Sequence, residues 1–271
     1  MYSGTIFRTK SGRVMGVHQK IDRIAHRHIK KVIPKRVEFP TTHDILHFEG
    51  LNGPDGIKKK SPARDEPWHY IDPTNPADRA IVDMINDHLY NMAAALRQKN
   101  TVRAAFEAAW LAHTIVDGLT PAHHYPLEAK LEELRGGQGL ETRSTTKDKL
   151  VLPGKTRRHQ LRNNWEYWGA KGVMTTHLAF ELGIATAIAP LRFDDTAPTK
   201  DQLKQVKREG FEPTYFAMLH HLADMDMYKE FSRTGWTHKL GTETRNILIP
   251  TMIKAVTLAW YHAYLMSEAQ Q

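Results

Sequence analysis

The 271-residue chain contains no cysteine, which excludes disulfide bonds and thiolate metal sites. No apolar run approaches the roughly 20 residues of a membrane-spanning helix, and residues 1–13 lack the continuous apolar stretch of a signal peptide. Strand-like alternation is scarce and no internal repeat is visible. We therefore expect a single all-α domain over residues 1–271, cytoplasmic as the chain is written, or secreted if a signal was removed.

Histidine and basic residues are abundant by contrast. The chain has 16 histidines, a formal net charge of +8 and a pI near 9.5. Without thiolates, any metal must be held by imidazole and carboxylate groups, which suit zinc or another borderline divalent ion. The positive charge indicates an anionic partner, which could be a phosphodiester substrate, nucleic acid or an anionic membrane surface contacted peripherally.

Apolar residues recur at helical spacing in several segments, and proline and glycine separate them. The polar segment 136–154 and the proline-rich segment 39–76 are predicted to be loops. A charged linker with one short helix is expected over 192–210. The main helices are expected at about 17–32, 76–98, 101–118, 128–134, 160–189, 213–231 and 242–267.

One motif on the expected helix 101–118 carries most of the functional signal. Its apolar stripe ends in His113 and Asp117, four residues apart. Side chains at this spacing lie roughly 5–6 Å from each other at Cβ and can reach one metal ion. The chain then turns at Pro121, and His123 follows where it could face the same cavity. A buried His bonded to a buried Asp as an ordinary core pair is the alternative.

The same pattern recurs on the expected helix 160–189. His177 and Glu181 interrupt an apolar stripe at a spacing of four, and a buried charge of this kind needs a partner such as a cation. His18 lies on the apolar side of the first expected helix. These positions extend the candidate ligand set to three helices.

Collected in order, these motifs resemble those of the zinc-dependent phospholipase C and single-strand-specific nuclease superfamily. The resemblance covers about residues 14–190 and leaves 191–271 as additional packing helices. Its central motif, His-x3-Asp-x3-Pro-x-His, is matched without a gap. The matching residues are His18, Pro54-Asp55, Trp68-His69-Tyr70-Ile71-Asp72, the central set His113, Asp117, Pro121 and His123, and the later pair His177 and Glu181.

The resemblance implies two to three zinc ions in a cleft between helices and the hydrolysis of a phosphodiester by a metal-activated hydroxide. Asp55 would be a ligand or the catalytic base. By the same resemblance, the first ion is held by His69, His113 and Asp117, the second by Asp117 and His18, and the third by His123, His177 and Glu181.

The chain differs from the family in two places. In the family a free amino terminus, usually a Trp, completes the site beside the first His, whereas this sequence has Met1. The stretch between His123 and His177 is longer than usual and basic. Its segment 136–160 is interpreted as a lid, a basic substrate rim or a solvated loop.

Other histidines compete for these roles. His43 and Asp44 form the doublet of His-Asp metal phosphohydrolases, but no matching pair frames it. His220 and Asp224 repeat the His-x3-Asp spacing beyond the resembling region, where structural pairing is favoured. His124 could replace its neighbour as a ligand.

The leading hypothesis is a zinc-dependent phosphodiesterase of phospholipase C type that acts on a phospholipid or related phosphodiester. The first alternative is a nuclease on single-stranded DNA or RNA, in which Trp165, Tyr167 or Trp168 stacks on bases. The second is a non-catalytic basic helical module that binds nucleic acid or an anionic membrane and keeps the metal cluster only as a structural core. The sequence does not indicate an oligomeric state.

Overall fold

The computed structural model describes residues 1–2, 16–60 and 68–269 of the chain. Every regular element among these residues is helical, so the predicted all-α class is confirmed. None of the described helices is both long and apolar enough to cross a membrane. Pro62 and Pro67, which contributed to the loop prediction for 39–76, lie outside the described residues.

The largest unit of the fold is a set of packed helices that we call the bundle. Its core consists of fully buried aliphatic and aromatic side chains, among them Ile21, Ile115 and Trp260. The Trp260 indole also donates a 3.0 Å hydrogen bond to the Ala108 carbonyl, which ties the last helix to the central one. The bundle comprises α1 (Val17–Val32), α2 (Thr42–His47), α4 (Ala80–Arg97), α5 (Thr101–Gly118), α11 (Glu212–Ala223) and α14 (Ile249–Glu268).

The prediction of a loop over 39–76 is wrong for its first part. This segment contains α2, the 3-10 turn η1 (Gly50–Asn52) and α3 (Pro54–Lys60). Thr41 and Asp44 form a reciprocal capping box at the start of α2, and Ile45 anchors it in the core. These helices are too short for hydrophobic periodicity to reveal them.

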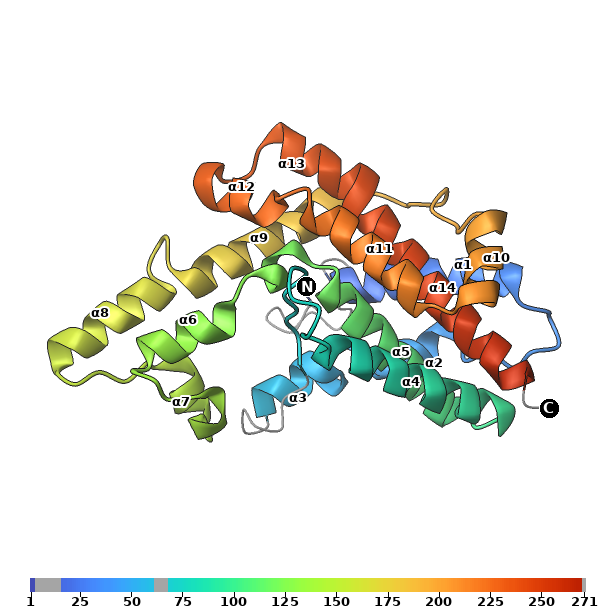
Figure 1. Ribbon diagram of the computed structural model, residues 1–271, viewed down its shortest axis with the longest axis horizontal. Coiled ribbons are helices and arrows are strands. Elements are labelled where there is room, and N and C mark those ends of the chain that lie inside the picture. Colours follow the sequence, from blue (N-terminus) through green and yellow to red (C-terminus); the bar gives the residue numbers. More distant parts are fainter. Residues whose placement is uncertain (3–15, 61–67, 270–271) are drawn as a thin grey trace.

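A second unit, which we call the arm, projects from the bundle (Figure 1). It consists of α6 (Leu127–Leu134), the 3-10 turn η4 (Leu140–Thr142), α7 (Thr146–Leu150) and α8 (Arg157–Trp168). Its small core is separate from that of the bundle and is formed by Leu127, Leu131, Leu134, Leu152 and Tyr167. The predicted loop over 136–154 therefore contains a 3-10 turn and a short helix.

The expected single helix over 160–189 is two helices in the structure. α8 ends at Trp168, and α9 (Val173–Ile188) returns to the bundle. The chain turns tightly between them: a Cβ atom at Gly169 would lie 2.4 Å from the Trp165 carbonyl oxygen.

The C-terminal third also contains more elements than expected. A break at Asp226, which adopts φ 51°, divides the predicted helix over 213–231 into α11 and α12 (Met227–Thr234). The last predicted helix begins with a π-helical turn, η5 (Thr244–Leu248), before α14. The remaining elements are α10 (Lys200–Glu209), which lies in the charged linker as expected, and α13 (His238–Glu243).

Candidate metal centre

Three groups of imidazole and carboxylate side chains meet where α1, α3, α5 and α9 converge. In each group, three potential ligand atoms lie within 4.8 Å of one another. The structure brings together all the residues that the sequence predicted as ligands or base. The groups are His18, His113 and Asp117; Asp55, His69 and His113; and His123, His177 and Glu181.

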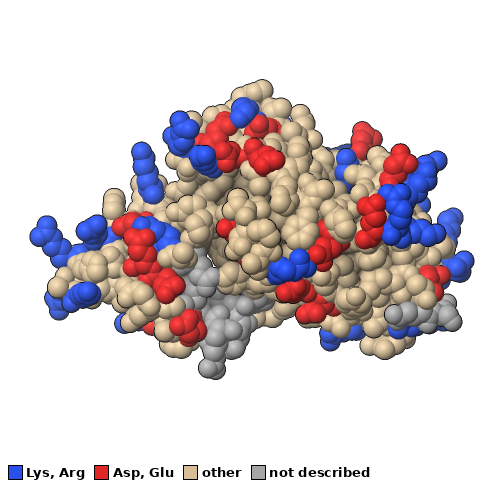
Figure 2. All heavy atoms as spheres, in the orientation of Figure 1, with Lys and Arg blue, Asp and Glu red and all other residues tan. Residues whose placement is uncertain are grey.

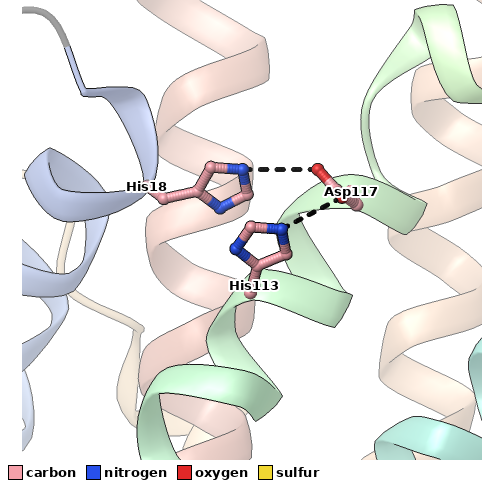
Figure 3. Close-up of side chains that lie close together, drawn as sticks. All are labelled: His18, His113 and Asp117. Atoms are coloured by element: carbon pink, nitrogen blue, oxygen red, sulfur yellow. Dashed lines mark ion pairs between the residues drawn. The ribbon is translucent and has the colours of Figure 1, made fainter. Parts of the chain in front are cut away.

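The first group joins α1 to α5 (Figure 3). The His18 and His113 rings stack with their centroids 3.9 Å apart and an interplanar angle of 4°. The Nε2 atom of each ring lies 3.3 Å from a different oxygen of Asp117. His113 and Asp117 face the same way because they are one helical turn apart.

Asp117 is the centre of the whole arrangement. Its Oδ2 atom also accepts a hydrogen bond from His69 Nδ1, and its Oδ1 atom lies 3.7 Å from His123 Nδ1. Asp55 joins from the first turn of α3, with its Oδ1 atom 3.9 Å from His113 Nε2. The Asp117 carboxylate thus contacts four of the five imidazoles in the three groups.

The third group joins the turn after α5 to α9. Both His123 Nε2 and His177 Nε2 lie 3.1 Å from the same oxygen of Glu181. The chain can reach this position because α5 ends at Gly118, where a Cβ atom would lie 2.1 Å from the Tyr215 hydroxyl oxygen. His177 and Glu181, one helical turn apart on α9, are thus joined by His123 from a separate turn of the chain.

The amino group of Met1 lies inside the same cluster. It is 2.5 Å from Asp117 Oδ1 and 3.2 Å from Glu181 Oε1, and the Met1 carbonyl oxygen is 2.9 Å from His18 Nε2. Burial alone would lower the pKa of this amino group, but the two carboxylates outweigh burial and raise it to about 10. A positive charge therefore lies between Asp117 and Glu181 in this structure.

The chemistry of the donor set fits a bound divalent cation. His69 Nε2, His113 Nε2 and His123 Nδ1 are buried without a hydrogen-bond partner among the described residues. Burial and the Met1 amino group lower the pKa of His123 to about 3, which keeps its ring neutral. The pKa of Asp117 is held well below its usual value: burial opposes this, but the amino group and neighbouring imidazoles outweigh it. Neutral imidazole and ionised carboxylate are the forms that bind metal.

Two buried carboxyl groups behind the site escaped the sequence analysis. Glu49 Oε2 lies 3.4 Å from His113 Nδ1, on the opposite side of the ring from Asp117. Asp22 lies on α1, and both of its carboxylate oxygens are buried without a hydrogen-bond partner among the described residues. Burial and repulsion from Glu49 raise the pKa of Asp22 well above its usual range. Asp22 could have been found from its spacing of four from His18, whereas Glu49 carries no such signal.

A cavity of about 370 Å³ opens onto the cluster. Its wall combines ligand side chains with basic residues and with apolar residues from the arm and α9. The basic residues are Lys58, Arg143 and Lys149, and the apolar ones include Leu150, Trp168, Met174 and Leu178. The segment 136–160 thus supplies part of the cavity wall.

The competing histidines lie apart from this cluster among the described residues. The His43 side chain is 93% exposed, and Asp44 caps α2. His124 bonds to the Gly118 carbonyl oxygen instead of joining its neighbour in a group. His220 and Asp224 also belong to none of the three groups.

The predicted aromatic stacking surface is only partly accessible. Tyr167 is buried in the arm core, so its predicted role in stacking on bases is wrong. Trp165 is 74% exposed on α8, and Trp168 lies at the cavity wall.

Comparison of the chain with protein-family models, with curated proteins and with solved structures finds no match. The structure itself shows an all-α protein with buried groups of His and acidic residues that could hold metal ions.

Proposed function

We propose that the protein is a zinc-dependent phosphodiester hydrolase of phospholipase C type. The observation that carries this proposal is the convergence of three potential ligand groups around Asp117, beside a cavity with basic residues in its wall. A structural metal site is usually closed by four protein ligands, whereas a catalytic site keeps a position open to substrate. A cavity that reaches the ligands themselves favours the catalytic arrangement.

Different residues of the cluster would bind different metal ions. Asp55, His69 and His113 would surround one position, with Asp117 in contact with both imidazoles, and His18, His113 and Asp117 would surround a second. His123, His177 and Glu181 would hold a third ion. Zinc bound in such a cluster would polarise phosphoryl oxygens and lower the pKa of a water molecule toward neutrality.

Asp55 would orient the attacking water. Its side chain is 24% exposed, against 1% for Asp117, and it lines the cavity. Burial alone would raise its pKa, but attraction to His113 and His69 outweighs burial and lowers the pKa to about 2. An ionised carboxylate on the cavity wall can bind a metal ion or accept a hydrogen bond from the attacking water.

The apolar part of the cavity wall supports a phospholipid or similar ester as substrate. Leu150, Met174 and Leu178 offer aliphatic surface beside the metal cluster. Single-stranded nucleic acid is the second candidate, because Trp168 offers a ring for stacking near the basic Lys58. Release of diacylglycerol or of nucleotides, assayed under identical zinc conditions, distinguishes the two substrates.

The deciding experiment measures metal content and turnover on the same protein, purified without chelator or histidine tag. We expect two to three zinc ions per chain by plasma mass spectrometry and hydrolysis of a phosphodiester. Asp55→Asn should abolish turnover while the helical circular dichroism is kept. Asp224→Asn, the same change in a His-x3-Asp pair outside the cluster, should retain both metal and turnover. A chain that binds no ion after zinc is offered would overturn the proposal.

A further inference from the structure

One arginine in the cavity wall has no partner for its charge among the described residues. The Arg143 side chain is buried at 9% exposure, and its Nε atom has no hydrogen-bond partner in the described part of the chain. Its guanidinium makes no ion pair or hydrogen bond with any described residue. Arg135, on the same arm, shows the contrast: it donates to the Asp148 carbonyl oxygen at 3.1 Å and to Thr142 Oγ1 at 2.9 Å.

Arg143 shares its cavity with the metal cluster. The same wall contains Asp117, His123 and Glu181, and the positive charge of Arg143 acts on the Tyr70 hydroxyl, which lines the cavity too. Arg143 lies just before α7. That helix is tied to the bundle side because Lys149 Nζ donates a 2.5 Å hydrogen bond to the Lys58 carbonyl oxygen. The arm thus brings the positive charge of Arg143 into the cavity that contains the metal cluster.

A guanidinium with little exposure and no counter-charge among the described residues favours an anionic ligand in the cavity. Taking an ionised group out of water without a counter-charge is unfavourable. The cluster carboxylates do not fill this role, because none of them lies within 4 Å of Arg143 in an ion pair. The planar guanidinium matches two oxygens of a phosphate group, which lysine cannot do in the same way.

We propose that Arg143 binds the phosphate of a phosphate ester whose adjoining apolar or aromatic group lies against Leu150, Trp168 and Met174. This inference rests on the proposed function, since it takes the metal cluster as the place of reaction. It goes further by assigning substrate binding to a residue of the arm and by defining the ligand as an anion joined to an apolar group.

The first test measures binding of phenylphosphonate, which carries both an anion and a ring, by calorimetry on zinc-loaded protein. We expect Arg143→Gln to weaken binding about 10- to 100-fold, as the loss of a charge-assisted hydrogen bond does. Arg143→Lys should fall between Arg143→Gln and wild type. The matched control is Arg162→Gln, an exposed arginine on α8 of the same arm, which should bind like wild type.

The second test probes the apolar wall. Wild type should bind phenylphosphonate several-fold more tightly than methylphosphonate, and Met174→Ala should reduce this preference without weakening methylphosphonate. Equal affinity for the two phosphonates in wild type would overturn the apolar half of the proposal. Equal affinity of Arg143→Gln and wild type for both phosphonates would overturn the anionic half.

The experiments distinguish failure of the anion site at Arg143 from failure of the proposed hydrolase function. Metal content is measured on every sample, and the titrations are repeated after chelation. Phosphonate binding that depends on Arg143 without metal supports the anion site even if no turnover exists. A short-chain phospholipid below its micellar concentration and a dinucleotide then separate the two sources of phosphate. Loss of affinity in Arg143→Gln for either one supports the proposal, and loss for neither overturns it.

Discussion

The bundle and the arm differ in how their side chains are held, and the candidate site uses both. The bundle core is large, and many of its residues are fully buried, whereas the arm has a small core of its own. On α8, Leu161 is 72% exposed and Trp165 is 74% exposed. Figure 2 shows basic side chains at the tip of the arm, with acidic ones beside them, and further basic side chains at the opposite end of the molecule. The bundle supplies the candidate ligands His18, His113 and Asp117, and the arm supplies Arg143, Lys149, Leu150 and Trp168 to the cavity wall.

This difference has a physical reason. A metal cluster needs ligand atoms fixed to within a fraction of an ångström, which requires side chains locked by dense packing. Substrate-binding residues tolerate more motion, and regions with few buried contacts open at lower free energy than the core. We therefore expect changes in the bundle to alter metal content and global stability, and changes in the arm to alter substrate affinity.

The largest effect is expected for Asp117→Asn in the bundle. The substitution removes the carboxylate that contacts four of the five imidazoles in the cluster, so we expect loss of at least one ion per chain and of turnover by about 10³-fold or more. Metal analysis and phosphodiester hydrolysis measure the two effects, with circular dichroism as the test of folding. Asp224→Asn is the control. If the Asp117→Asn protein is folded and still binds as many metal ions as wild type, Asp117 is not a metal ligand and the site does not depend on the bundle as proposed.

A pair of matched core substitutions tests the difference in packing directly. Leu258→Ala, fully buried in α14, should cost about 2–5 kcal/mol of global stability and lower the Tm by roughly 5–15 °C. Leu131→Ala in the arm core should leave the global Tm nearly unchanged and accelerate proteolysis within the arm. Thermal denaturation and limited proteolysis of the two variants decide this. Equal losses of Tm would show that the arm and the bundle unfold as one unit.

Glu49→Gln tests how the bundle orients its ligands. Glu49 faces His113 Nδ1 at 3.4 Å, a position from which it fixes the ring so that Nε2 faces the cluster. Loss of such a partner typically weakens metal binding about 10- to 100-fold. Competition with a zinc indicator measures the change. Glu107→Gln, a buried glutamate paired with His88 and Arg103 outside the cluster, should alter stability and leave zinc affinity unchanged.

The sequence predicted those parts of the site that follow from helical spacing. α1 has the bounds expected from periodicity, and the pairs His113 with Asp117 and His177 with Glu181 converge as their positions on helices required. Asp55 and His69, which lie on no long helix, were placed by the family resemblance alone, and the structure brings them to the same cluster.

The remaining features depend on tertiary contacts that no local pattern encodes. Glu49 follows a short helix inside a segment that was predicted to be a loop, and its partner is 64 residues away. Arg143 is one of several basic residues in the segment 136–160, and the sequence alone does not show that it is buried. The proposed roles of both residues depend on groups that are distant in the sequence, so the spacing of residues along the chain could not identify them.

The smallest expected effect is on thermal stability, and it concerns Asp55 on α3, the helix that the arm contacts through Lys149. The pKa of Asp55 falls from the usual 3.8 to about 2 on folding, since attraction to His113 and His69 outweighs burial. The ionised carboxylate therefore stabilises the fold above about pH 4, and this contribution is lost as the pH falls toward 2. In protein stripped of metal, we expect wild type to melt about 5 °C above Asp55→Asn at pH 6. The difference should shrink between pH 4 and pH 2, as scanning calorimetry would show. A difference that stays constant or grows on acidification would mean that the imidazoles do not hold this carboxylate in the folded protein.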